Sequence, residues 1–117
     1  MKRDYRLFIK DIMEAIEDIE VFIGDMNSKN FYADKKTRSA VVWKLEVIGE
    51  GTKNIPASIR SKYKELPWKD MAGMRDKISH FYFGIDYKIV WEVIRKKLPI
   101  IKPVIKKMLK DFKAERS

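Results

Sequence analysis

The first part of the chain carries apolar residues at the spacing of an α-helix. Between Asp4 and Ile23 they recur every three or four positions, which places them along one helical stripe: Phe8, Ile12, Ile16, Ile19 and Ile23. Gly24 follows this stripe and is typical of a helix end. The next segment, from Asp25 to about Asp34, is rich in Asn, Ser and Asp and predicts a loop.

A second helix is predicted from Asp34, which can cap the first amides, to a point before Pro56, which itself opens a short helix. Residues 40–48 within it are apolar on more than one face. In a small protein, such a helix favours a second contact surface, for example another subunit. Gly49 and Gly51 each weaken the helix by about 1 kcal/mol relative to alanine, which indicates close backbone packing or an early end.

The rest of the chain also predicts helices. One begins near Lys69 and is ended or kinked by Gly84. Asp86 can cap the last helical region, and Pro99 and Pro103 are expected to split this region in two or to kink it. No run alternates apolar and polar residues for long enough to predict a strand. The expected fold class is therefore all-α, a bundle of four to five helices.

The length of 117 residues predicts a single domain over residues 1–117. The chain has no cysteine, which excludes disulfides, thiolate metal ligands and a cysteine nucleophile, and which fits a reducing compartment. No stretch approaches the roughly 20 apolar residues of a membrane-spanning helix. The first residues lack the apolar core of a secretory signal. We therefore expect a cytoplasmic protein with no membrane partner.

The net charge of +9 favours a polyanionic partner. A well-solvated, lysine-rich surface of the kind found in thermophilic proteins fits the same numbers. Lysines near the end of the chain lie at near-helical spacing and fit either a nucleic-acid-binding surface or a solvated face: Lys102, Lys106, Lys107, Lys110 and Lys113. Charge alone does not decide the function.

The candidate chemistry lies in residues 75–82, which read Arg-Asp-Lys-Ile-Ser-His-Phe-Tyr and contain the only histidine, His80. On an ideal helix, Asp76 and His80 project together, because they are four residues apart. The carboxylate can fix the tautomer of the imidazole or raise its pKa. A separate stripe is expected to face the core: Met71, Met74, Ile78, Phe81 and Ile85.

A histidine near an arginine suits RNA cleavage without a metal ion. The imidazole can take the proton of a 2′-hydroxyl or supply one to the leaving oxygen, and the guanidinium can neutralise the charge at phosphorus. Arg75 and His80 diverge by about 140° on an ideal helix. Two motif helices that face each other across a twofold axis would therefore combine one subunit's arginine with the other's histidine. An ordinary surface ion-pair cluster, with Tyr82 packed at its rim, explains the same residues.

The spacing Arg75-x4-His80-x-Tyr82 resembles the signature of HepT-like toxins, which belong to the HEPN superfamily of helical ribonucleases. The resemblance runs through about residues 40–100 in consistent order. It includes these segments: Val47-Ile48-Gly49-Glu50, Tyr63 with Leu66-Pro67-Trp68, the core from Met71 to Tyr82, and Asp86 with Trp91.

This resemblance implies a homodimeric HEPN-type bundle that cleaves RNA as an endoribonuclease, without a metal or another cofactor. It implies that Arg75 and His80 are the catalytic pair, in a cleft shared by two subunits. Asp76 stands where the family often has Asn, and we expect it to support His80 by raising its pKa. Glu50 is a further candidate supporting residue.

The resemblance also implies a toxin of a type VII toxin–antitoxin system. Its partner would be a minimal nucleotidyltransferase antitoxin, in a homodimer or a larger hetero-oligomer, and the antitoxin would transfer adenylyl groups to Tyr82. Two alternatives stay open: a non-catalytic helical protein that binds a nucleotide or the nucleotidyltransferase, and a basic protein that binds nucleic acid without cleaving it.

Overall fold

The structure is a computed structural model that describes residues 3–80 and 84–115. Its first helix, α1 (Tyr5–Ile23), begins at Asp4, whose carboxylate accepts a hydrogen bond of 2.9 Å from the backbone N–H of Arg6. It ends at Gly24, which has a φ of 54°. Both ends agree with the expectation from the apolar stripe, because the capping residues lie at the two limits of the periodic pattern.

The sequence predicted a loop between the first two long helices, and this prediction is wrong for part of the segment. It contains a short helix, α2 (Ser28–Ala33). Asn27 and Asn30 explain this helix, because each side chain accepts a hydrogen bond from the backbone N–H of the other residue. This reciprocal pair is a capping box, so the same polar residues that suggested a loop start a helix.

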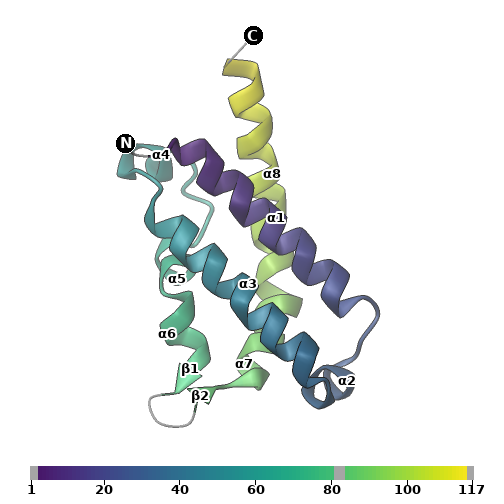
Figure 1. Ribbon diagram of the computed structural model, residues 1–117. Helices are drawn as coiled ribbons and strands as arrows, with labels where there is room; N and C mark the ends of the chain where they lie inside the picture. Colours follow the sequence, from purple (N-terminus) through teal and green to yellow (C-terminus); the bar gives the residue numbers. More distant parts are fainter. Residues whose placement is uncertain (1–2, 81–83, 116–117) are drawn as a thin grey trace.

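The second long helix, α3 (Lys35–Lys53), begins at Asp34, whose carboxylate accepts a hydrogen bond of 3.0 Å from the backbone N–H of Thr37. It packs along α1 (Figure 1). The close packing expected at the glycines is confirmed. A Cβ atom at position 51 would lie only 3.2 Å from Cγ1 of Ile12 on α1.

The second half of the chain consists of shorter segments and one long helical run. The short elements are α4 (Ala57–Lys62), α5 (Trp68–Ala72), α6 (Met74–Ile78) and the paired strands β1 (Ser79–His80) and β2 (Gly84–Ile85). The long run consists of α7 (Tyr87–Glu92), the π-helical turn η1 (Val93–Lys97) and α8 (Leu98–Glu115).

Pro99 and Pro103 were expected to split the last region in two or to kink it, and the first of these two outcomes is wrong. Helical structure continues from α7 to the end of α8, and Pro103 lies inside α8. Pro99 is the second residue of α8 and lies directly after the π-helical turn. The helix departs from regular α-helical geometry in the π-helical turn η1, but it does not break there.

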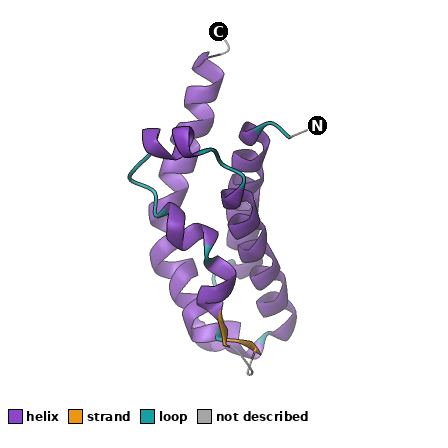
Figure 2. Cartoon of the chain, turned by 90° about the vertical axis from the view of Figure 1, so that its left-hand side faces the viewer, coloured by secondary structure: helices purple, strands orange, loops and turns teal. Residues whose placement is uncertain are grey.

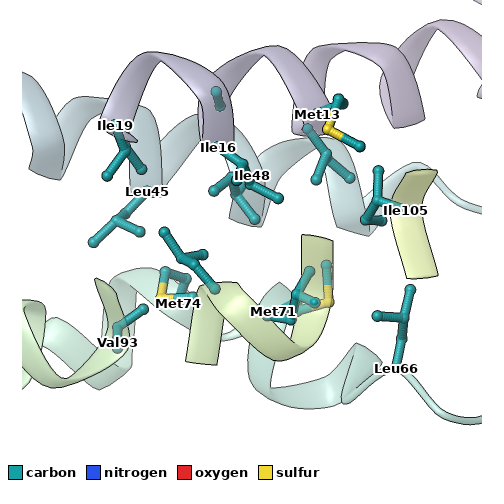
Figure 3. Packing of buried hydrophobic residues seen from close by; sticks show 14 of the residues in the cluster. Met13, Ile16, Ile19, Leu45, Ile48, Leu66, Met71, Met74, Val93 and Ile105 are labelled. Carbon is teal, nitrogen blue, oxygen red and sulfur yellow. The ribbon is translucent and has the colours of Figure 1, made fainter. Parts of the chain in front are cut away.

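The helices enclose one hydrophobic core, and the all-α class is confirmed. Figure 3 shows how the core joins α1 to α3 through Ile16 and Ile48, and to α6 and α8 through Met74 and Ile105. Helix covers nearly the whole chain in Figure 2, and the two short strands lie at one end. Among the residues that the structure describes, no helix is long and apolar enough to cross a membrane.

Candidate active site

The motif begins on α6, which a close contact fixes against α3. Met74 and Ile78 of α6 are buried, as expected from the core stripe. A Cβ atom at position 49 of α3 would lie 3.3 Å from the carbonyl oxygen of Met71 and 3.4 Å from Cβ of Met74. Gly49 therefore allows α3 to approach the junction of α5 and α6 so closely that α6 has a defined position.

The prediction that Asp76 and His80 project together from one helix is wrong. The helix ends at Ile78, and Ser79 adopts an extended conformation with φ −105° and ψ 137°. In the antiparallel strand pair that follows, Ser79 lies opposite Ile85 and His80 lies opposite Gly84. The four-residue spacing of a helix does not apply across this change, because residues in a strand alternate between two faces.

Two features close the strand pair. The backbone N–H of Asp86 donates a hydrogen bond of 2.7 Å to the carbonyl of Ile78. Gly84 has a φ of 78°, a backbone conformation that residues with a side chain rarely adopt. Phe81 and Tyr82, which were expected on the core stripe and at the modification site, lie outside the described residues, and only the backbone of His80 is described.

Arg75 and Asp76 lie on the exposed side of α6. Within residues 3–80 and 84–115, neither side chain forms a hydrogen bond or an ion pair, although they are neighbours in sequence. An ordinary ion-pair cluster therefore does not account for Arg75 in this part of the chain. Its guanidinium donors remain available for an anion.

Glu50, the other expected supporting residue, lies on the exposed surface of α3 next to Gly49. Its carboxylate forms an ion pair of 3.1 Å with Lys53, which lies three residues further along the helix. The described contacts do not join Glu50 to Arg75 or Asp76.

A buried polar link connects the segment before α5 to the end of α8. The indole Nε1–H of Trp68 donates to the carbonyl of Tyr63 across 2.9 Å, and the phenol of Tyr63 donates to Oδ2 of Asp111 across 2.8 Å. Burial, and then this hydrogen bond to a carboxylate, raise the pKa of Tyr63 to about 12. Trp68 was expected to be a packing residue, and its burial confirms this.

A groove of about 210 Å³ runs beside α6. Its lining includes Met74 and Lys77 of α6, and Val93, Lys97 and Ile100 of the helical run that follows the strands. Ile100 in this lining is 62% exposed. In the part of the chain that the structure describes, no three His, Cys, Asp or Glu side chains gather in a group that could hold a metal ion.

Comparison with known proteins supports the ribonuclease class. The family described as "Ribonuclease HepT-like" matches residues 12–108. Two proteins of Methanocaldococcus jannaschii, named "Putative RNase MJ0127" and "Putative RNase MJ1216", are each 46% identical over 97% of this chain and 94% of their own length. A Thermococcus cleftensis protein named "Probable ribonuclease HepT" is 43% identical over 94% of this chain and its own full length. No solved structure matches. The chain therefore belongs to the HepT-like ribonuclease family, an enzyme class that its sequence had led us to expect.

Proposed function

We propose that this chain is a metal-independent endoribonuclease and the toxin of a type VII toxin–antitoxin system. Arg75 and His80 form its catalytic pair, and each complete site takes the arginine from one subunit and the histidine from the other. The observation that carries this proposal is the exposed guanidinium of Arg75, which has no described partner and lies on a helix that leads directly into the strand of His80.

The reaction needs a proton-transfer group and a fixed cation. The 2′-oxygen of the RNA attacks phosphorus as it loses its proton, the bond from phosphorus to the 5′-oxygen breaks, and that oxygen gains a proton. The products carry a 2′,3′-cyclic phosphate and a 5′-hydroxyl. His80 has the side chain suited to one of these proton transfers near neutral pH, and Arg75 stabilises the charge on the phosphate oxygens. Asp76 and Glu50 are supporting carboxylates in this proposal.

A second subunit accounts for the exposed apolar surface. Ile100 lines the groove beside α6, and Trp43 on α3 is also 62% exposed. Such side chains are enriched where protein surfaces meet. A copy of the chain that covered the groove would lie next to α6 and could place its histidine near Arg75.

Tyr82 lies in the connection between β1 and β2, outside the described residues. It is two residues from His80 in sequence. A minimal nucleotidyltransferase that transferred AMP to its hydroxyl would add bulk and a negative phosphate to the motif. Both would oppose the binding of an RNA phosphate.

Cleavage of RNA by the purified protein in the presence of EDTA tests the enzymatic part. We expect products with cyclic phosphate ends, and we expect Arg75→Ala and His80→Ala each to lower kcat/KM by at least about 100-fold. Arg6→Ala is the control, because Arg6 pairs with Asp4 at the start of α1, away from the motif. Cleavage that survived both motif substitutions, or that required a divalent ion, would contradict the proposal.

Intact-mass measurement tests the regulatory part. The protein is incubated with ATP and a purified minimal nucleotidyltransferase, and we expect added AMP on the wild type but not on a Tyr82→Phe variant. A stable complex with the nucleotidyltransferase, without RNA cleavage and without added AMP, would favour the non-catalytic alternative.

A further inference from the structure

Helices α2 and α7 share a cluster of aromatic rings at the end of the molecule that carries the strand pair. Phe31 is fully buried at its centre. Its ring centroid lies 6.1 Å from that of Tyr32, 6.4 Å from that of Tyr87 and 5.2 Å from that of Trp91. The three outer rings are half-buried, so the cluster belongs both to the core and to the surface.

Two arginines lie over the outer rings of this cluster. The guanidinium carbon of Arg38 is 4.4 Å from the ring centroid of Tyr87, and that of Arg95 is 5.7 Å from the ring centroid of Trp91. Arg38 is half-buried, and its Nε is fully buried without a hydrogen-bond partner among the described residues. A buried donor without an acceptor is uncommon in a folded protein and requires an explanation.

No acidic side chain of the described residues pairs with Arg38. Residues 28–38 and 86–97 together contain eight Lys or Arg and only three Asp or Glu. Glu92 pairs at 3.2 Å with the lysine four residues later. The carboxylates of Asp34 and Asp86 accept hydrogen bonds from backbone amides at the starts of α3 and α7. The surface therefore offers stacked guanidinium groups within an excess of positive charge.

This surface adjoins the motif. Tyr87, which lies under Arg38, directly follows Asp86, and the backbone N–H of Asp86 closes the strand pair through Ile78. Figure 1 shows α2, α7 and the two strands at the same end of the bundle. A nucleic acid strand that reached His80 would pass close to this end.

We propose that this arginine–aromatic face, formed by Tyr32, Arg38, Tyr87, Trp91 and Arg95, binds the backbone of the RNA strand beside the phosphate that is cleaved. Arg38, whose Nε is buried, donates to one RNA phosphate through its terminal guanidinium nitrogens, and Arg95 reinforces the contact. The rings hold the guanidinium planes in place, so little side-chain freedom is lost when the phosphate binds. The inference rests on the proposed function, because it takes RNA as the substrate.

Fluorescence anisotropy with a labelled single-stranded oligoribonucleotide tests this contact in the full-length His80→Ala protein, which holds RNA without cutting it. Adding Arg38→Ala should raise the Kd about 10-fold. It should also reduce the slope of log K against log salt concentration by about 0.7, the contribution of one phosphate contact to a single strand. A residue with a merely structural role would not change this slope.

The chain offers a matched control. Arg6 lies over the ring of Tyr5, with its guanidinium carbon 5.8 Å from the ring centroid, but it pairs with Asp4 and lies at the start of α1. Arg6→Ala should change neither Kd nor the salt slope. Tyr87→Leu removes the ring that Arg38 lies over and should weaken binding in the same direction as Arg38→Ala.

The binding readout separates this inference from the proposed function. If wild-type protein cleaves RNA and Arg38→Ala leaves Kd and the salt slope unchanged in a protein with an unaltered circular dichroism spectrum, the inference is overturned and the ribonuclease assignment stands. If wild-type protein does not cleave RNA, the anisotropy series still decides whether Arg38 contacts phosphate. A change in oligomeric mass on Arg38→Ala, with unchanged RNA affinity, would instead assign the face to a contact between copies and would overturn the inference.

Discussion

The backbone N–H of Asp86 lies 2.7 Å from the carbonyl oxygen of Ile78, and this hydrogen bond joins the last residue of α6 to the residue that caps α7. It fixes the two ends of the segment that contains His80 and Tyr82. The motif thus begins on a helix and continues into a short strand pair. Its arginine therefore lies in helix α6 and its histidine in strand β1.

Gly84 offers a test of this strand pair, and Gly24 offers a matched control. Both have positive φ values, 78° and 54°, and a Cβ atom would meet no atom closer than 4.0 Å at either position. Alanine should therefore destabilise both variants by about 1–2 kcal/mol through backbone strain alone. Only Gly84→Ala should also lower RNA cleavage, because it distorts the strand opposite His80. Urea unfolding and kcat/KM measure the two effects, and equal activity in both variants would refute the link.

Gly49 and Gly51 should both resist alanine, although they meet different neighbours. Alanine favours a helix by about 1 kcal/mol over glycine, so a loss of stability at either position reports overpacking. At position 51 the tight neighbour is Cγ1 of Ile12, a fully buried β-branched side chain with little freedom to rotate. At position 49 the tight neighbour is the carbonyl of Met71, which cannot move without α5. We expect each variant to lose about 1 kcal/mol or more of unfolding free energy, as overpacked sites do. A variant as stable in urea as the wild type would show that the neighbouring helix moves away easily.

The buried phenol of Tyr63 predicts a dependence of stability on alkaline pH. Its pKa is raised from 10.0 in the free side chain to about 12 in the fold. The folded protein therefore holds this proton more tightly than the unfolded chain does. The resulting stabilisation is complete below pH 10 and is lost as the pH rises through 12, by about 2–3 kcal/mol in total.

Tyr63→Phe isolates this effect from the titration of lysines in the same range. The variant should lose about 1 kcal/mol at pH 7, because the hydrogen bond to Asp111 is gone. The difference in unfolding free energy between wild type and variant should then shrink above pH 10 and change sign by pH 12, because only the wild type loses about 2–3 kcal/mol. A difference that stayed constant over this range would show that the pKa of the phenol is the same in the folded and the unfolded protein.

Subunit mixing tests whether the site is shared between two copies. Arg75→Ala and His80→Ala chains with different affinity tags are co-expressed, and the mixed dimer is purified through both tags. In a shared arrangement, the mixed dimer contains one intact site and one doubly defective site. It should therefore regain about half of the wild-type activity, whereas each mutant homodimer stays inactive. Activity that remained absent from the mixed dimer would place arginine and histidine in the same subunit.

The long helices could be predicted from sequence because their signals are local. Asp4, Gly24 and Asp34 mark the ends of α1 and α3, and the apolar spacing between them fixes the buried faces. The helix α2 was missed because the side chains of Asn27 and Asn30 suit both a loop and a capping box, and only their reciprocal hydrogen bonds decide between the two.

The residues of the candidate site stay a prediction, and their local geometry could not be predicted from the sequence. The apolar spacing of Met74 and Ile78 predicted a helix that continued through His80, but the helix ends at Ile78. Gly84 was expected to end or kink this helix, but the chain already leaves the helix at Ser79, and Gly84 lies in β2 with a φ of 78°. The stacking of Arg38 on Tyr87 had no sequence signal, since the two residues are 49 positions apart and meet only in the folded bundle.

The π-helical turn η1 has a consequence for how this chain can change in length. A π-helical turn holds one more residue than an α-helical turn, so it acts as a one-residue insertion within a continuous helix. Removing one residue from Val93–Lys97 would let a regular α-helix span this stretch while α8 kept its rotational phase. A one-residue deletion in the regular part of α7 would instead rotate everything after it by about 100°. The side chains that α8 buries, Ile101, Ile105, Met108 and Phe112, would then turn away from the core. The bundle should therefore tolerate a one-residue deletion in η1 better than one in α7.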